Sequence, residues 1–201
     1  MNQIEALRRL RAIAVPVVES RDVAALLRVS SGNATTVLRG LAGAGMIVHL
    51  SRGRWLIDTD SDRLLLPELL SAPDPAYVSL QSALSYHGLI EQIPSVIYAV
   101  TPGRTRRVDT PRGTISFHRL PPELILGFDF APGSDAKIAT PEKALFDHLY
   151  LAPARSRLFA KLPELSIPRG FSWRQLAEYA TLVRSPGRRA FVVERIKAVR
   201  G

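Results

Sequence analysis

Between residues 20 and 57, the hydrophobic positions follow a helical spacing twice and then form two short strand-like runs. The apolar positions of the first helical set are Val23, Leu26 and Leu27. We expect this helix to begin at Ser20, whose hydroxyl is placed to cap the first turn, and to end near residues 28–29. Asp22 lies in the first turn, where the helix dipole favours an acid. The pattern therefore predicts a short helix that a tight turn joins to a second helix.

We expect the second helix to be capped by Ser30 or Ser31 and to end at Gly43 and Gly45. Its apolar face comprises Ala34, Val37, Leu38 and Leu41. The opposite face carries Asn33, Thr36 and Arg39, and Ser31, Gly32 and Thr35 lie near the start of the helix. Asn can pair with adenine, Arg with guanine, and Thr can touch a thymine methyl group or a phosphate. These residue types suit a helix that enters the major groove of DNA.

The strand-like runs follow directly, at residues 46–50 and 54–57. Residues 51–53, Ser-Arg-Gly, read as the tight turn between them. Arg52 and Arg54 therefore sit on a hairpin beside the second helix, where they are placed to contact phosphates or a minor groove.

Two further elements precede this region. Residues 3–13 form an amphipathic helix, and residues 15–18 are extended and are expected to pair with the hairpin as a third strand. The inward positions of the helix are Ile4, Leu7 and Leu10. Residues 1–65 are thus predicted to be a winged helix-turn-helix domain that binds DNA. The alternative is a winged domain that serves as a protein-interaction module.

The rest of the chain predicts a second domain, residues 66–201, after an acidic stretch at 58–62. Residues 64–70 are a short helix or strand broken by Pro67, and Ser71–Pro75 is a chain breaker at the expected boundary. The further expected elements are helices at 79–87, 140–150, 172–183 and 187–200, and strands at 96–100, 105–108 and 113–118. The predicted fold class is α+β, with a mixed C-terminal domain that ends in basic helices.

Several residues mark the ends of these helices. Ser79 is expected to cap the first and Gly88 to follow it; Thr140 caps the second, with Pro141 and Glu142 in its first turn. The inward faces of the last two helices are expected to be Trp173, Leu176, Ala177, Ala180 and Val183, and Phe191, Val192, Ile196 and Val199.

The charge changes this picture mainly through its distribution. The chain has 201 residues and a net charge of +9. Residues 1–57 carry +5, residues 58–70 carry −3, residues 71–154 carry −1 and residues 155–201 carry +8. Two basic ends suit a polyanion held from two sides, although charge that serves solubility is the simpler alternative for the C-terminal end.

The composition excludes several classes of protein. There is no cysteine, which excludes disulfides and thiolate metal sites. No apolar run is long enough for a transmembrane helix, and the first residues lack the apolar core of a signal peptide. We therefore expect no membrane association and a cytoplasmic protein.

Catalytic signals are weak. The four histidines show no metal-ligand spacing, and a nucleophile elbow, a phosphate-binding loop and a dinucleotide turn are all absent. The one suggestive group is Glu142, Lys143, Asp147 and His148, which we interpret as the solvated face of a capped helix. His87 is interpreted as a packed, hydrogen-bonded side chain. We expect no enzyme activity, no cofactor, no metal and no catalytic residues.

Three stretches nevertheless resemble a known family. They are the hairpin region with Gly45-Met-Ile and Ser51-Arg-Gly-Arg-Trp55, the segment YVSLQSALSYHGLI at residues 77–90, and the segment IATPEKALFD at residues 138–147. With the strand SVIYAVT and the hairpin TPRGTISFH, the likeness spans roughly residues 5–150. In these features the chain resembles the AbiEi-type antitoxins, the transcription regulators of bacterial type IV toxin–antitoxin pairs.

The resemblance implies that the chain binds inverted repeats in double-stranded DNA upstream of its own operon and represses it. It also implies that the C-terminal domain counters a nucleotidyltransferase-like toxin without a stable complex. By location, the DNA-contacting region of the family corresponds to Asn33, Thr36, Arg39, Arg52 and Arg54. The motif residues of the C-terminal domain are Ser79, Ser82, His87, Thr140, Glu142 and Lys143. The alternatives are a solitary regulator without a toxin and a module that binds RNA or a protein.

Overall fold

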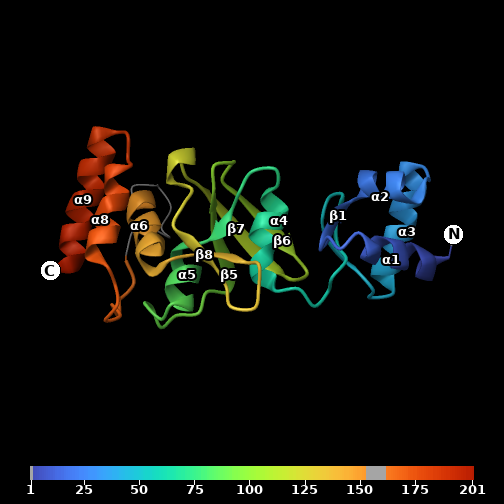
Figure 1. The fold of residues 1–201 in the computed structure, drawn as a ribbon, viewed down its shortest axis with the longest axis horizontal. Helices are drawn as coiled ribbons and strands as arrows, with labels where there is room; N and C mark the ends of the chain where they lie inside the picture. Colours follow the sequence, from blue (N-terminus) through green and yellow to red (C-terminus); the bar gives the residue numbers. More distant parts are fainter. Residues whose placement is uncertain (1, 153–161) are drawn as a thin grey trace. The chain divides into compact units, whose positions relative to one another are not determined.

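The computed structural model describes residues 2–152 and 162–201 (Figure 1). The chain folds into two compact units, one of Met1–Arg63 with Val108–Thr114, and the other of Leu64–Arg107 with Ile115–Gly201. Both units combine helices with a sheet, so the α+β fold class is confirmed. Part of the predicted C-terminal charge lies outside the described residues, on Arg155, Arg157 and Lys161.

In the first unit, three helices pack against a small antiparallel sheet. Its elements, in chain order, are α1 (Gln3–Ala12), β1 (Val17–Glu19), α2 (Ser20–Leu27), α3 (Ser31–Gly43), β2 (Val48–Ser51) and β3 (Arg54–Leu56). The strand order is β1-β3-β2. The extended segment before α2 therefore pairs with the hairpin as a third strand, as predicted.

The core of the first unit confirms the predicted inner faces of α2 and α3. The fully or nearly fully buried side chains are Ala6, Leu10, Val18, Val23, Leu27, Ala34, Leu38, Leu41, Ile47, Trp55 and Ile57. The prediction that Ile4 packs inward is wrong, because its side chain is 68% exposed. Ala6 and Leu10, one turn apart, form the inner face of α1 instead.

The prediction that Ser20 caps α2 is also wrong. Ser20 is the first residue of the helix, and its Oγ accepts a hydrogen bond of 2.9 Å from Trp55 Nε1 on β3. The hydroxyl thus links the helix to the sheet instead of satisfying the first turn. By contrast, Ser30 caps α3 as expected, since its Oγ accepts from the backbone N–H of Asn33 at 3.3 Å.

The larger sheet, most of which lies in the second unit, is mixed and six-stranded, with the order β6-β7-β5-β4-β9-β8. The strands are β4 (Tyr77–Val78), β5 (Val96–Thr101), β6 (Arg106–Thr110), β7 (Gly113–Arg119), β8 (Phe128–Phe130) and β9 (Lys137–Ala139). Strand β4 is antiparallel to β5 and parallel to β9. The helices are α4 (Leu66–Ser71), α5 (Leu80–Tyr86), α6 (Pro141–Leu151), α8 (Trp173–Thr181) and α9 (Pro186–Arg200), with 3₁₀ turns at Arg63–Leu65 and Pro122–Leu124.

Helix α6 is the centre of the second unit. It packs on α5, β9, α8 and α9, and Figure 1 shows it between the sheet and the α8–α9 pair. The prediction that Glu142, Lys143, Asp147 and His148 form a solvated face is therefore wrong: none of the four is more than 6% exposed. A helix covered on all sides must bury its polar residues with the apolar ones, and these have to find partners inside the protein.

Smaller differences have local causes. Pro67 occupies the first turn of α4, where a missing N–H costs nothing, so it does not break the segment. Ser79 occupies the cap position of α5, but its side chain makes no capping bond and points to α6. Ala177 and Phe191 are exposed, contrary to prediction, and Tyr179 is buried in the α8 face instead.

Candidate functional site

A hollow of about 610 Å³ opens in the first unit between α3 and one face of the small sheet. Its lining residues come from α2, α3 and the β2–β3 hairpin, and they are Ser20, Thr35, Arg39, Ala42, His49, Arg52, Gly53 and Trp55. Arg39 from α3 and Arg52 from the hairpin thus meet at one site, although they lie 13 positions apart in the sequence. Among the residues that the structure describes, none that lines the hollow carries a carboxylate.

Strand register decides which side chains face this hollow. Val18, Trp55 and His49 form one row across the sheet, so their side chains point to the same face. The His49 ring lies against the Trp55 ring, with centroids 4.4 Å apart. Trp55 is only 4% exposed and is tied by its Nε1 to Ser20, so it provides a fixed support for the imidazole.

Arg54 belongs to the neighbouring row, which points to the opposite face of the sheet. Its Nε lies 3.7 Å from the Glu19 carboxylate, and its side chain is 23% exposed. The same carboxylate accepts from Arg21 at 2.9 Å. The structure therefore brings Arg39 and Arg52 together but places Arg54 in an ion-paired cluster away from the hollow.

The N-terminal half of α3 presents a polar surface. Ser31, Asn33 and Thr36 are exposed and Thr35 is half-buried. The Thr35 and Thr36 hydroxyls donate to backbone carbonyls one turn earlier, at 2.9 and 3.1 Å. The two hydroxyl protons are thus used within the helix, and the oxygens can still accept. Within the described residues, the Asn33 side chain makes no hydrogen bond.

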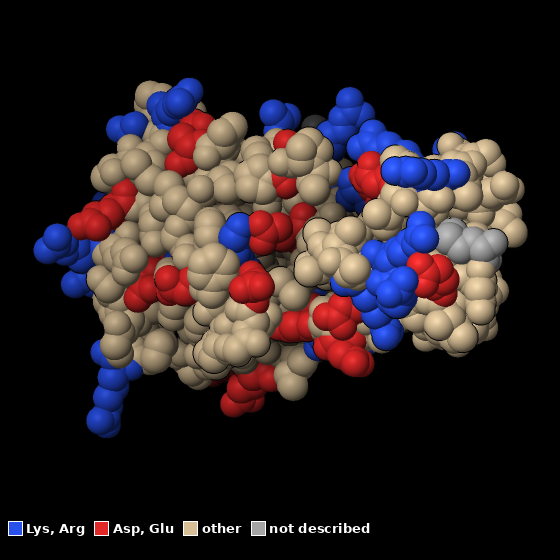
Figure 2. Space-filling model, turned by 45° about the vertical axis from the view of Figure 1, so that its right-hand side comes forward, with Lys and Arg blue, Asp and Glu red and all other residues tan. Residues whose placement is uncertain are grey.

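Arginine dominates the exposed charge of the first unit. Figure 2 shows Lys and Arg side chains gathered on the visible face of this unit, with fewer acids among them. Arg8 and Arg9 are paired with Glu5, at 2.9 and 2.8 Å. Within the described part of the chain, Arg39 and Arg52 have no ion-pair partner. These two cations are therefore available to an external anion.

The second unit contains a buried ionic cluster that sequence reasoning missed. Lys143 and Asp147, one turn apart on α6, form an ion pair with neither side chain exposed. Asp147 Oδ2 accepts from Ser79 Oγ at 2.7 Å and from Tyr77 Oη at 3.1 Å. Lys143 Nζ also donates to Tyr77 Oη at 2.8 Å and lies 5.2 Å from the centre of the Phe146 ring. The cluster thus fastens α6 to β4.

Burial controls the proton affinities in this cluster. Loss of solvation lowers the pKa of Lys143 and raises that of Asp147, in both cases against their mutual attraction. It also raises the pKa of Tyr77, helped by the neighbouring Asp147 charge. All four polar groups are satisfied within the cluster and are buried, so they hold the fold together and present no group to a substrate.

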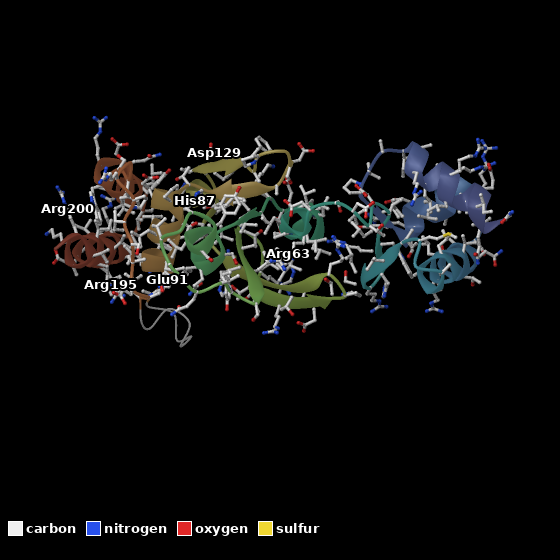
Figure 3. The ribbon with its side chains drawn as sticks, turned by 90° about the horizontal axis from the view of Figure 1, so that it is seen from below. Arg63, His87, Glu91, Asp129, Arg195 and Arg200 are labelled. Carbon is white, nitrogen blue, oxygen red and sulfur yellow. The ribbon has the colours of Figure 1, made fainter. Side chains whose placement is uncertain are left out.

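The remaining motif residues also hold the second unit together. Ser82 Oγ makes two hydrogen bonds to the backbone of β5, of 2.9 and 3.2 Å. His87, at the end of α5 (Figure 3), places Nε2 at 2.7 Å from the carbonyl that ends β9. Thr140 caps α6 as predicted, and Glu142 accepts from the backbone N–H that precedes α8 at 2.7 Å.

In the described residues, no three His, Asp or Glu side chains come together in a way that would hold a metal ion. None of the helices there combines the length and apolar character needed to cross a bilayer. No model of a known protein family matches the chain. No curated protein matches it significantly either.

Proposed function

We propose that the chain is a sequence-specific DNA-binding transcription regulator whose first unit is a winged helix-turn-helix. The element order α1-β1-α2-α3-β2-β3 and the strand order β1-β3-β2 support this proposal. In it, α2 and α3 are the helix-turn-helix and the β2–β3 hairpin is the wing. The observation that carries the proposal is the convergence of Arg39 and Arg52 on one acid-free hollow beside the polar half of α3.

The proposed mode of binding follows from the side chains. Helix α3 enters the major groove, which is wide enough for one helix. Asn33 and Arg39 then read base edges, because their donors and acceptors match adenine and guanine. The Thr36 methyl group suits a thymine methyl, and Arg52 from the hairpin neutralises a backbone phosphate. Arg54 contributes indirectly, through the ion pair with Glu19 that fixes the start of β3.

We further propose that the target is an inverted repeat upstream of the chain's own operon, and that the second unit counters a nucleotidyltransferase-like toxin without binding it stably. The resemblance to AbiEi-type antitoxins supports this part. The motif segments 77–90 and 138–147 form β4, α5, β9 and α6, which pack on one another. The likeness therefore concerns the core of the second unit. It does not identify a surface through which this unit would act on a toxin.

A promoter fusion tests the regulatory proposal. The full chain should lower expression of a reporter placed behind the region upstream of its own gene, and Arg39→Ala should restore expression at equal protein level. The control variant Arg11→Ala removes the same charge from an exposed position of α1, and it should still repress the reporter. Equal reporter expression with and without the chain would reject the proposal.

A growth assay separately tests the antitoxin part. Where a nucleotidyltransferase-like protein is encoded next to the chain's own gene, co-expression of the full chain should restore growth of cells that express that protein. If growth is not restored while repression is intact, the antitoxin proposal is rejected, and the chain is a solitary regulator.

The competing class, a module that binds RNA or an acidic partner through its basic C-terminal helices, has weaker support. Most basic side chains of α9 are engaged within the second unit. Arg188 Nη1 donates to an α6 carbonyl at 3.3 Å, and Arg189 Nε donates to a carbonyl after α8 at 2.9 Å. Lys197 pairs with an acid on its own helix. The other two basic residues of this helix are Arg195 and Arg200 (Figure 3).

A further inference from the structure

We propose that the hollow between α3 and the β2–β3 hairpin holds one backbone phosphodiester of the DNA, and that His49 makes this contact proton-linked, so that affinity for DNA rises as the pH falls. The inference rests on the proposed DNA binding and adds a ligand group and a pH dependence to it. The features that carry it are the lining of the hollow, the fixed position of the His49 ring and the absence of a nearby acid.

The lining matches a phosphodiester. Two guanidinium groups and one imidazole share the hollow, and each can donate to phosphate oxygens. The other polar side chains are already committed. Ser20 Oγ accepts from Trp55, and Thr35 Oγ1 donates to the carbonyl of Ser31. The anion would therefore be bound by Arg52 and His49. Arg39, which the proposed binding mode places on a base edge, adds positive charge to the same hollow.

The His49 ring is held where it can act. It sits on the edge strand β2, is exposed to solvent, and lies against the buried Trp55 ring at an interplanar angle of 40°. Because Trp55 is fixed by Ser20, the imidazole loses little freedom when an anion binds. Arg39 on α3 lines the same hollow.

The charges around His49 explain the direction of the effect. The groups that share its hollow are Arg39 and Thr35 from α3, Arg52 from the hairpin, Trp55 from β3 and Ser20 from α2. The nearest sheet acid, Glu19, points to the other face and is paired with Arg54. Without DNA, the described residues that line the hollow include two arginines and no acid. A phosphodiester supplies the missing anion, so DNA binding favours uptake of a proton by the ring.

The test spans pH 5.5 to 8.0, the range in which histidine side chains in general act as charge switches. The affinity of the full chain for duplex DNA should rise by about tenfold from pH 8.0 to pH 5.5, the gain expected for one charge-assisted hydrogen bond. Protonation also adds one phosphate-neutralising charge. The salt slope should therefore steepen by about 0.9 at the lower pH. Because a backbone phosphate carries no sequence information, both effects should appear on upstream and random duplexes.

The test is fluorescence-anisotropy titration of the full chain with both duplexes at pH 8.0 and 5.5, at two chloride concentrations. His49→Gln should remove most of the pH dependence and of the steeper salt slope, so that its affinities at pH 5.5 and pH 8.0 are nearly equal. His118→Gln is the matched control. Burial lowers the pKa of His118 to about 4, outside the window, so this variant should behave as the wild type.

The outcomes separate the two proposals. Binding by the wild type with a pH dependence that His49→Gln leaves unchanged would overturn the inference and leave the DNA-binding proposal standing. Absence of binding to either duplex at any pH would reject the DNA-binding proposal itself. Replacement of chloride by inorganic phosphate at equal ionic strength should weaken DNA binding by the wild type more than it weakens binding by His49→Gln, because both anions would use this hollow. An equal effect of phosphate on the two proteins would overturn the assignment of an anion to the hollow.

Discussion

Lys143 and Asp147 pair on consecutive turns of α6 with no exposure of either side chain. Burial acts against both charges, as the lowered pKa of Lys143 and the raised pKa of Asp147 indicate. The pair is therefore tolerated because Tyr77 and Ser79 complete its hydrogen bonds. Such a pair contributes more to the unique placement of α6 on β4 than to the free energy of unfolding.

This predicts a non-additive pair of substitutions. Lys143→Met should lower the free energy of unfolding by about 3–5 kcal/mol, because it strands a buried carboxylate. The double variant Lys143→Met/Asp147→Leu should lose far less, since both charges are gone. Urea unfolding followed by circular dichroism measures both. Single and double variants with the same loss would show that the two side chains do not depend on each other.

A second prediction concerns pH. Burial first, and the Arg195 charge second, lower the pKa of His148 to about 4, below the value of about 6.5 in an unfolded chain. Between these values the unfolded state binds more protons, so stability is fully present above pH 6.5 and is lost as the pH falls toward 4. The contribution is up to about 3 kcal/mol. His148→Leu should flatten the pH dependence of urea midpoints in this window, and an unchanged slope would contradict the assignment.

A third prediction concerns the space around Gly127, where an added Cβ would contact neighbouring side chains. Its φ is +74°, and an added Cβ would lie 2.6 Å from Tyr179 Oη and 3.1 Å from Lys143 Cγ. Gly133 has nearly the same φ, +70°, but no atom within 4 Å of such a Cβ. Gly133→Ala thus carries only the backbone cost of roughly 1 kcal/mol. Gly127→Ala should cost at least about 1 kcal/mol more. Equal thermal shifts for the two variants would mean that the Tyr179 ring moves freely.

The local signals in the sequence predicted much of the fold. Ser30 and Thr140 cap their helices, and the apolar spacing gave the inner faces of α2 and α3, because capping and periodicity depend on neighbouring residues. The ionic cluster was missed because its partners lie 66 to 70 positions apart, on β4 and α6. A signal was present: the apolar residues of α6 are not confined to one face of the helix, which is typical of a buried helix.

The residues of the candidate interface were predicted only in part. Arg39 and Arg52 were identified from their positions on a helix and a turn. The exclusion of Arg54 and the inclusion of His49 depend on strand register, since a shift of one residue exchanges the two faces of a sheet. The tight turn was predicted one residue too long, so the sequence left that register undetermined.

A fourth prediction concerns base recognition. Arg39→Ala should weaken binding to the specific duplex by about 1–3 kcal/mol, the value of one base-reading contact, and should weaken random duplex much less. Arg39 has no partner within the described residues that its loss would strand, so stability should not change. Arg11→Ala on α1 controls for net charge. Equal losses on both duplexes would identify Arg39 as a phosphate contact.

The most direct test of the central claim is competition binding of the full chain to the duplex upstream of its own gene. Fluorescence anisotropy against random competitor, at two salt concentrations, measures the specificity ratio independently of net charge. The proposal predicts a preference of about a thousandfold or more for the upstream duplex. Equal and steeply salt-dependent affinity for both duplexes would contradict it, because that behaviour requires only a basic surface.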